Sequence, residues 1–157
     1  AGQNGENTTI SGSTLNIVAY GGGGGGAVDG NGLSGGSGGG AGVRKSGGGT
    51  NPGSAIYGDY GNGGGQETTC GTGGRGGAGG GAGGPGINNN PGTGFVTTIR
   101  GTTEYVAHGG APGIGGVACS YSSLPTGWND AIAGQGATQN AVGGLRQGIV
   151  VITYPLG

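Results

Sequence analysis

The stretch Gly73–Gly86 reads Gly-Gly-Arg-Gly-Gly-Ala-Gly-Gly-Gly-Ala-Gly-Gly-Pro-Gly, so all but four of its fourteen positions are glycine. Amphipathic helices and strands both need apolar side chains on one face, and this stretch has almost no side chains. The other four residues fall in two pairs with a spacing of three, which is the repeat of a polyproline II-type helix. The backbone groups of such a helix find their partners outside it, and glycine lets neighbouring chains come close. The stretch therefore predicts several glycine runs packed as a polyglycine II bundle.

The composition supports one unusual domain. The chain has 157 residues and 52 glycines, but its few prolines and its adjacent glycines do not fit collagen. A disordered linker has a similar composition. Three features favour a folded domain instead: the charged fraction is only 7%, segments with β character separate the glycine runs, and both ends of the chain are strand-like.

The two ends of the chain predict a small β framework. Leu15, Ile17 and Ala19 alternate with other residues within 7–20, which predicts a strand with one well-buried face. Consecutive β-branched residues in 148–155 predict a strand buried on both faces, with the strand near Leu15–Ala19 as its partner. The predicted fold is mainly irregular and β, with essentially no α-helix.

An internal repeat divides the chain. Residues 8–22 match residues 97–110 with a one-residue gap, and each copy leads into a glycine run. We therefore expect a single domain, 1–157, with two related modules at about 7–92 and 93–157. Two copies are too few for a solenoid.

Catalytic and metal-binding patterns are absent from the sequence, so we expect a protein that is not an enzyme and needs no cofactor. His108 is the only histidine and aligns with Tyr20, which favours a structural role at a strand end. The net charge of −1 and the scattered basic residues give no reason to expect nucleic acid as a partner, and no apolar run is long enough for membrane insertion. Cys70 and Cys119 are the only cysteines, and they fit either one disulfide or two free thiols.

A β segment that opens into glycine (Ile17–Gly22), interrupted glycine tracts and the closing Gly-Ile-Val-Val-Ile-Thr-Tyr-Pro together resemble the glycine-rich domain of tailed-phage tail-fibre and virion proteins. The chain is also similar to the fibre-tip adhesins of T-even-like phages. The resemblance implies a polyglycine II scaffold whose loops attach the virion to a bacterial surface receptor, either protein or glycan. It also implies a virion-surface or extracellular location, with other virion or fibre subunits as partners.

Two segments between glycine runs, 43–62 and 117–140, carry aromatic residues, and we expect receptor contacts there because aromatic side chains dominate binding energetics. The candidate contacts are Tyr57, Tyr60, Tyr121, Trp128, Asn129 and Asp130. The same aromatics could instead cap the ends of the glycine bundle. Two other functions are consistent with the sequence: a self-assembling structural subunit of a viral or extracellular filament or shell, and an ice-binding protein. Either an adhesin or an assembly subunit could form a homo-oligomer.

Overall fold

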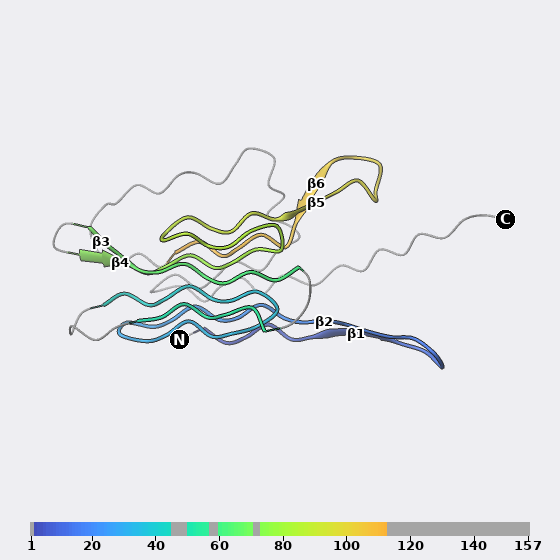
Figure 1. Cartoon of the computed structure of the whole chain (residues 1–157), viewed down its shortest axis with the longest axis horizontal. Helices are drawn as coiled ribbons and strands as arrows, with labels where there is room; N and C mark the ends of the chain where they lie inside the picture. Colours follow the sequence, from blue (N-terminus) through green and yellow to red (C-terminus); the bar gives the residue numbers. More distant parts are fainter. Residues whose placement is uncertain (1, 45–49, 57–59, 71–72, 113–157) are drawn as a thin grey trace.

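The computed structural model describes residues 2–44, 50–56, 60–70 and 73–112 (Figure 1). These residues contain no helix and form three separate antiparallel hairpins, in agreement with the predicted mainly β and irregular fold. The strands are β1 (Thr8–Ser11), β2 (Asn16–Ala19), β3 (Thr68–Cys70), β4 (Gly73–Arg75), β5 (Phe95–Thr97) and β6 (Glu104–Val106).

The segment predicted as one strand, 7–20, is a hairpin. β1 pairs with β2 from Thr8 opposite Ala19 to Ser11 opposite Asn16, and Gly12 donates its N–H to the Leu15 carbonyl in the turn. The predicted buried face is wrong, because Leu15 and Ile17 are each 51% exposed. The physical reason is that the hairpin projects past the end of the glycine runs, where no other described segment forms a second layer over it (Figure 1).

Within the described residues β2 has β1 as its neighbour. The terminal segment 148–155 lies outside them, so its pairing with β2 stays a prediction.

An antiparallel hairpin accompanies each copy of the internal repeat, but the first strand of the second hairpin lies almost entirely before the repeat begins at 97. β6 occupies the place of β2 in the repeat, whereas β5 ends at Thr97, the residue that aligns with the start of β1. The connection from β5 to β6 is longer and turns at Gly101, which has a φ of 86° and donates its N–H to the Thr98 carbonyl. The division into modules at 7–92 and 93–157 stays a prediction.

The third hairpin corrects one expectation. The sequence predicts one polyglycine run over 73–86, but its first residues form β4, which pairs with β3, with Thr68 opposite Arg75. β-branched threonines favour the pleated surface of a strand, and the first residues of the glycine run supply an unobstructed partner. The hairpin lies at the end of the molecule opposite to β1–β2 and β5–β6 (Figure 1).

Between the hairpins, extended glycine-rich segments lie side by side (Figure 1). The run 38–43 is buried along its whole length. Gly38 and Ala41 donate their N–H groups to the carbonyls of Asn62 and Gly65, at 2.9 and 3.1 Å. Because the step is three residues in both segments, these neighbours run parallel.

The same run bonds to further neighbours in other directions. Gly39 and Gly42 donate to the carbonyls of Leu33 and Gly30, each at 2.9 Å, so the segment 30–33 runs antiparallel on another side. The carbonyls of the run also accept N–H groups: Gly26 donates to Gly40, Gly53 to Gly39, and Gly77 and Gly80 to Ala41 and Gly38. Run 38–43 is thus surrounded by main chain, which satisfies most of its backbone polar groups without water.

The core consists of backbone rather than side chains. A Cβ on Gly38 would lie 1.9 Å from the Gly53 carbonyl oxygen, and one on Gly40 would lie 1.9 Å from the Gly77 oxygen. In the described part of the chain the buried apolar residues are Ala41, Val43 and Ala78, and no large side chain is fully buried. Glycine is therefore required by close backbone approach.

Polar side chains complete the backbone network where a segment ends or turns. Asn4 accepts the Gly24 N–H through Oδ1 and donates from Nδ2 to the Ser34 carbonyl, both at 2.9 Å. Asn62 donates from Nδ2 to the Gly81 carbonyl at 2.8 Å. These amides act as short extra peptide groups, so each side chain adds a hydrogen bond between neighbouring segments.

The segment 43–62, where receptor contacts are expected, is not exposed along its whole described length. Val43 and Thr50 are 5% and 2% exposed, and the Thr50 hydroxyl donates to the Gly42 carbonyl at 3.0 Å. Gly53 is also buried and donates its N–H to the Gly39 carbonyl. This part of the segment packs into the core, because a glycine allows the backbone to approach its neighbours closely.

Candidate functional site

We call the end of the molecule from which β1–β2 and β5–β6 project the hairpin end (Figure 1). Large apolar side chains are exposed on these two hairpins and on the residues that contact them. The members of this set are Leu15, Ile17, Tyr20, Ile56, Tyr60, Phe95, Val96 and Ile99. Exposed apolar side chains gathered at one end of a molecule are candidates for an interaction surface.

Tyr60 and Phe95 form an aromatic pair at the hairpin end. Their ring centroids are 5.4 Å apart with an interplanar angle of 74°, an edge-to-face arrangement. Tyr60 is 64% exposed and Phe95 43% exposed, so the pair offers ring surface to a partner. Such a contact contributes roughly 0.5–1.5 kcal/mol to stability, which favours packing of Tyr60 against Phe95 of β5 before any partner binds.

A groove of about 240 Å³ lies beside the β1–β2 hairpin, and we call it the Tyr20 groove. Its floor consists of glycines from three segments, and its side chains come from Asn4, Asn7, Tyr20, Ser34 and Ile56. Tyr20 directly follows β2 and is 41% exposed. The Asn7 Oδ1 atom accepts the Gly21 N–H at 2.9 Å, which fixes this amide at the edge of the groove.

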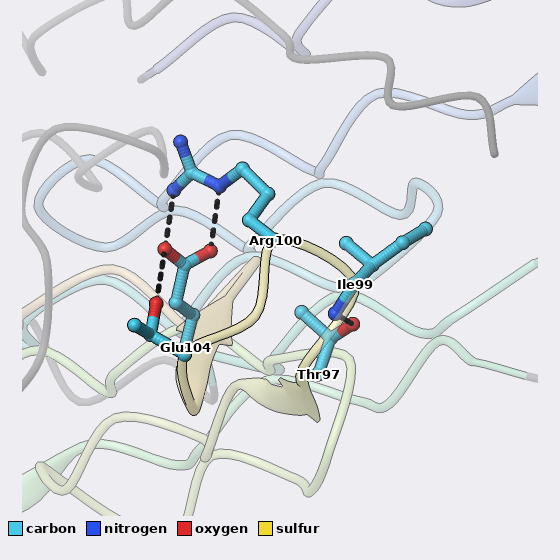
Figure 2. Close-up of polar contacts among 5 residues, drawn as sticks. Thr97, Ile99, Arg100 and Glu104 are labelled. Carbon is cyan, nitrogen blue, oxygen red and sulfur yellow. Dashed lines mark hydrogen bonds and ion pairs between the residues drawn. The ribbon is translucent and has the colours of Figure 1, made fainter.

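An ion pair orders the connection between β5 and β6 (Figure 2). Arg100 Nε donates to Glu104 Oε2 at 2.8 Å and Arg100 Nη2 donates to Oε1 at 2.7 Å. The Thr102 hydroxyl also donates to Oε1, at 3.4 Å, while the Ile99 N–H donates to Thr97 Oγ1 at 3.3 Å. The bidentate geometry orients the tip of the hairpin, but the exposed pair contributes only about 0–1 kcal/mol to stability.

Of the predicted contact residues, the structure describes Tyr60 and places it, exposed, at the hairpin end. Tyr57, Tyr121, Trp128, Asn129 and Asp130 lie outside the described residues, and their roles stay predictions. Cys70 is the last residue of β3 and Cys119 lies outside the described part, so the disulfide also stays a prediction.

Sequence reasoning missed Tyr20, Ile56 and Phe95. Tyr20 and Phe95 lie where a strand meets a glycine-rich segment, and an aromatic residue at such a junction could have marked both. Ile56 has no comparable local signal, because it joins Tyr20 only through the packing of segments distant in sequence.

The titratable groups of the described residues are dispersed. Among these residues no three His, Cys, Asp or Glu side chains gather to hold a metal ion. His108 follows β6 and is 5% exposed, with Nδ1 3.0 Å from the Gly109 carbonyl oxygen. Within the described chain no helix is long and apolar enough to cross a membrane.

No known protein family, curated protein or solved structure matches this chain.

Proposed function

We propose that this chain is a non-enzymatic phage virion protein, a tail-fibre or fibre-tip adhesin that attaches the virion to a bacterial surface receptor through its hairpin end. The observation that carries the proposal is the exposed aromatic and apolar set on two hairpins beside a core of close-packed glycine backbone. Exposed groups on a rigid scaffold are the usual location of recognition residues. The titratable pair at this end, Arg100 and Glu104, is engaged in an ion pair, and the exposed apolar and aromatic side chains beside it favour binding over catalysis.

The proposed scaffold is a polyglycine II bundle. The support is the step of three residues between successive bonds to one neighbour, as from Gly38 to Ala41 and from Gly39 to Gly42, since a polyproline II-type helix has three residues per turn. Backbone torsions from NMR couplings and chemical shifts test this assignment. We expect φ near −75° and ψ near +145° along 38–42, and values in the antiparallel β region would contradict it.

A bundle of this kind suits an adhesin for a physical reason. Its packing depends on backbone atoms, so side chains on projecting hairpins can change without disturbing the core. Leu15 and Ile17, each 51% exposed on β1–β2, illustrate this independence. The receptor surface can therefore vary while the scaffold stays the same.

The test is binding of the labelled protein to a panel of bacterial strains. Tyr60→Ala and Phe95→Ala should each weaken binding about tenfold or more, the loss expected of a hot-spot side chain, with a small change in melting temperature. Ile87→Ala is the matched control, because Ile87 is 62% exposed but lines a different groove with Pro85 and Pro91. If no strain binds the protein, the proposal is wrong. A large loss of stability in Tyr60→Ala would instead favour the capping role.

A second candidate function is an assembly subunit, favoured by the open edges of the hairpins. In the described residues β1 and β2 form a two-stranded sheet, so each has an edge without a strand neighbour. Such edges can pair between copies. Electron microscopy of the purified protein separates the two functions: regular filaments or a closed lattice favour the subunit, and discrete particles favour the adhesin.

A further inference from the structure

We infer that the Tyr20 groove is a binding site for one neutral sugar ring of the receptor. The inference rests on the proposed adhesin function, since it names the class of ligand that this part of the hairpin end would take. It depends on three features of the groove: its size, the hydrogen-bonding groups that remain available in it, and its lack of charge.

The floor of the groove has no free backbone donors for a peptide. The N–H groups of its four glycines all donate elsewhere: Gly5 to Gly22, Gly21 to Asn7 Oδ1, Gly35 to Ser54 and Gly36 to Gly21. A peptide that added itself as a strand would need main-chain donors of this kind. Hydrogen-bond donation to a ligand in the groove therefore depends on its side chains.

Two side chains offer neutral donors whose positions are already fixed. Asn7 uses its Oδ1 atom to accept the Gly21 N–H, and its Nδ2 group has no bond to any described residue. Ser34 uses its Oγ atom to accept the Ser54 N–H at 3.0 Å, and its carbonyl accepts from Asn4, which leaves the hydroxyl hydrogen to donate. Donors held in place by their own acceptor bonds lose little entropy when a ligand binds.

The walls and the volume select the ligand. Tyr20 and Ile56, 41% and 54% exposed, supply apolar surface for the C–H face of a pyranose ring, while the ring hydroxyls accept from Asn7 and Ser34. The lining contains no Asp, Glu, Lys or Arg, so a charged ligand gains no ion pair there. The volume, about 240 Å³, is below the roughly 300–1,000 Å³ of sites for drug-sized ligands, which fits a single sugar unit.

The test is an NMR titration of the full-length protein with glucose, galactose, mannose and N-acetylglucosamine, and with glucuronate as the charged comparison. At least one neutral sugar should shift the amide signals of Tyr20, Gly21 and Gly36 with a Kd on the order of 1 mM, the range of weak single-site ligands. Glucuronate should bind no more tightly. If none of the four neutral sugars shifts these signals, the inference is wrong.

Two variants and a matched control localise the binding. Tyr20→Ala should weaken sugar binding at least about tenfold, a change that corresponds to loss of one well-packed contact. Asn7→Asp keeps an oxygen for the Gly21 N–H but removes the Nδ2 donors, and it should also bind about tenfold more weakly. Gln3→Glu adds the same charge to an exposed residue outside the groove and should bind as the unmodified protein does. Equal sugar binding by all three variants would overturn the inference.

Cell-binding assays separate this inference from the adhesin proposal. Inhibition by purified lipopolysaccharide or by capsular polysaccharide supports the sugar site and identifies its source. If cells bind the protein while no neutral sugar does, the sugar site is wrong and the adhesin proposal stands. If a sugar binds at the groove while no strain binds the protein, the adhesin proposal is wrong and the site stands.

Discussion

At the scale of single residues, the position of each glycine decides whether it can be replaced. The ideal Cβ position on Gly40 is 1.9 Å from the Gly77 carbonyl oxygen, whereas Gly25 has no heavy atom within 4 Å of its Cβ position. The colliding atom at Gly40 is backbone in a neighbouring segment, which cannot rotate away as a side chain can. The same residue type is thus obligatory at one position and replaceable at another.

We predict opposite effects of alanine at these two glycines. Gly40→Ala should lower the free energy of unfolding by about 3 kcal/mol, the upper end of typical overpacking costs, because two segments must separate to admit the methyl group. Gly25→Ala should leave it unchanged or raise it by up to about 1 kcal/mol, because alanine restricts the unfolded chain. Urea unfolding measures both. Equal destabilisation by the two substitutions would contradict the backbone-packed core.

Thr50 provides a second test at a single residue. Its buried hydroxyl donates to the Gly42 carbonyl at 3.0 Å, and no backbone N–H of the described residues donates to that oxygen. Thr50→Val keeps the shape but removes the donor, so it should cost roughly 1–3 kcal/mol of unfolding free energy. Thr103→Val, at an exposed position, is the control and should stay within about 0.5 kcal/mol. A Thr50→Val protein as stable as its control would show that this bond is dispensable.

At the scale of elements, the hairpins are held mainly by their own strands. β1 and β2 meet edge to edge, with Ile10 opposite Ile17, and Ile17 is exposed, with no layer of described residues packed over it. Cross-strand pairs of this kind contribute less to the free energy of unfolding than the burial of a side chain in a core does. A hairpin can therefore change its side chains, or open, while the glycine segments behind it stay in place.

This difference predicts the cost of truncating Ile17. Ile17→Ala should lower the free energy of unfolding by roughly 0.2–1 kcal/mol, the range of a cross-strand pair. A buried isoleucine would cost about 2–5 kcal/mol. Chemical denaturation distinguishes the two ranges. A loss in the higher range would mean that another part of the protein covers this face of β2.

The Arg100–Glu104 pair predicts a small, salt-dependent contribution. A double-mutant cycle with Arg100→Ala and Glu104→Ala should give a coupling of at most about 1 kcal/mol, because the Arg100 side chain is 39% exposed. The coupling should decrease in about 1 M salt, where screening acts over roughly 3 Å. A larger coupling that does not change with salt would mean that the pair is shielded from water.

At the scale of the whole molecule, composition predicts the type of fold better than its details. The lack of long apolar periodicity correctly predicts a described chain without helices, and the glycine runs correctly predict segments that lie side by side. The sequence does not predict that Gly73–Arg75 forms β4, because a glycine-rich strand has no alternating pattern of its own. Nor does it predict exposure of Ile17 or the meeting of Tyr20 with Ile56, since both follow from the positions of segments far apart in sequence.

The bundle as a whole should unfold as one cooperative unit, with the hairpins opening separately. Run 38–43 bonds to neighbours on several sides, so its N–H groups cannot reach solvent until most of those segments have separated. Native-state hydrogen exchange should therefore give Gly38, Gly39 and Gly42 opening free energies equal to the global value from denaturation. Amides of β1 and β6, at the projecting hairpins, should exchange through local opening, with an opening free energy at least about 2 kcal/mol below the global value. This corresponds to a difference of more than tenfold in exchange rate.

Uniform exchange across the hairpins and run 38–43 would mean that the hairpins are part of the cooperative unit. Rapid exchange at Gly39 would mean that the backbone network does not hold the molecule together, and the scaffold role proposed for the glycine core would be lost.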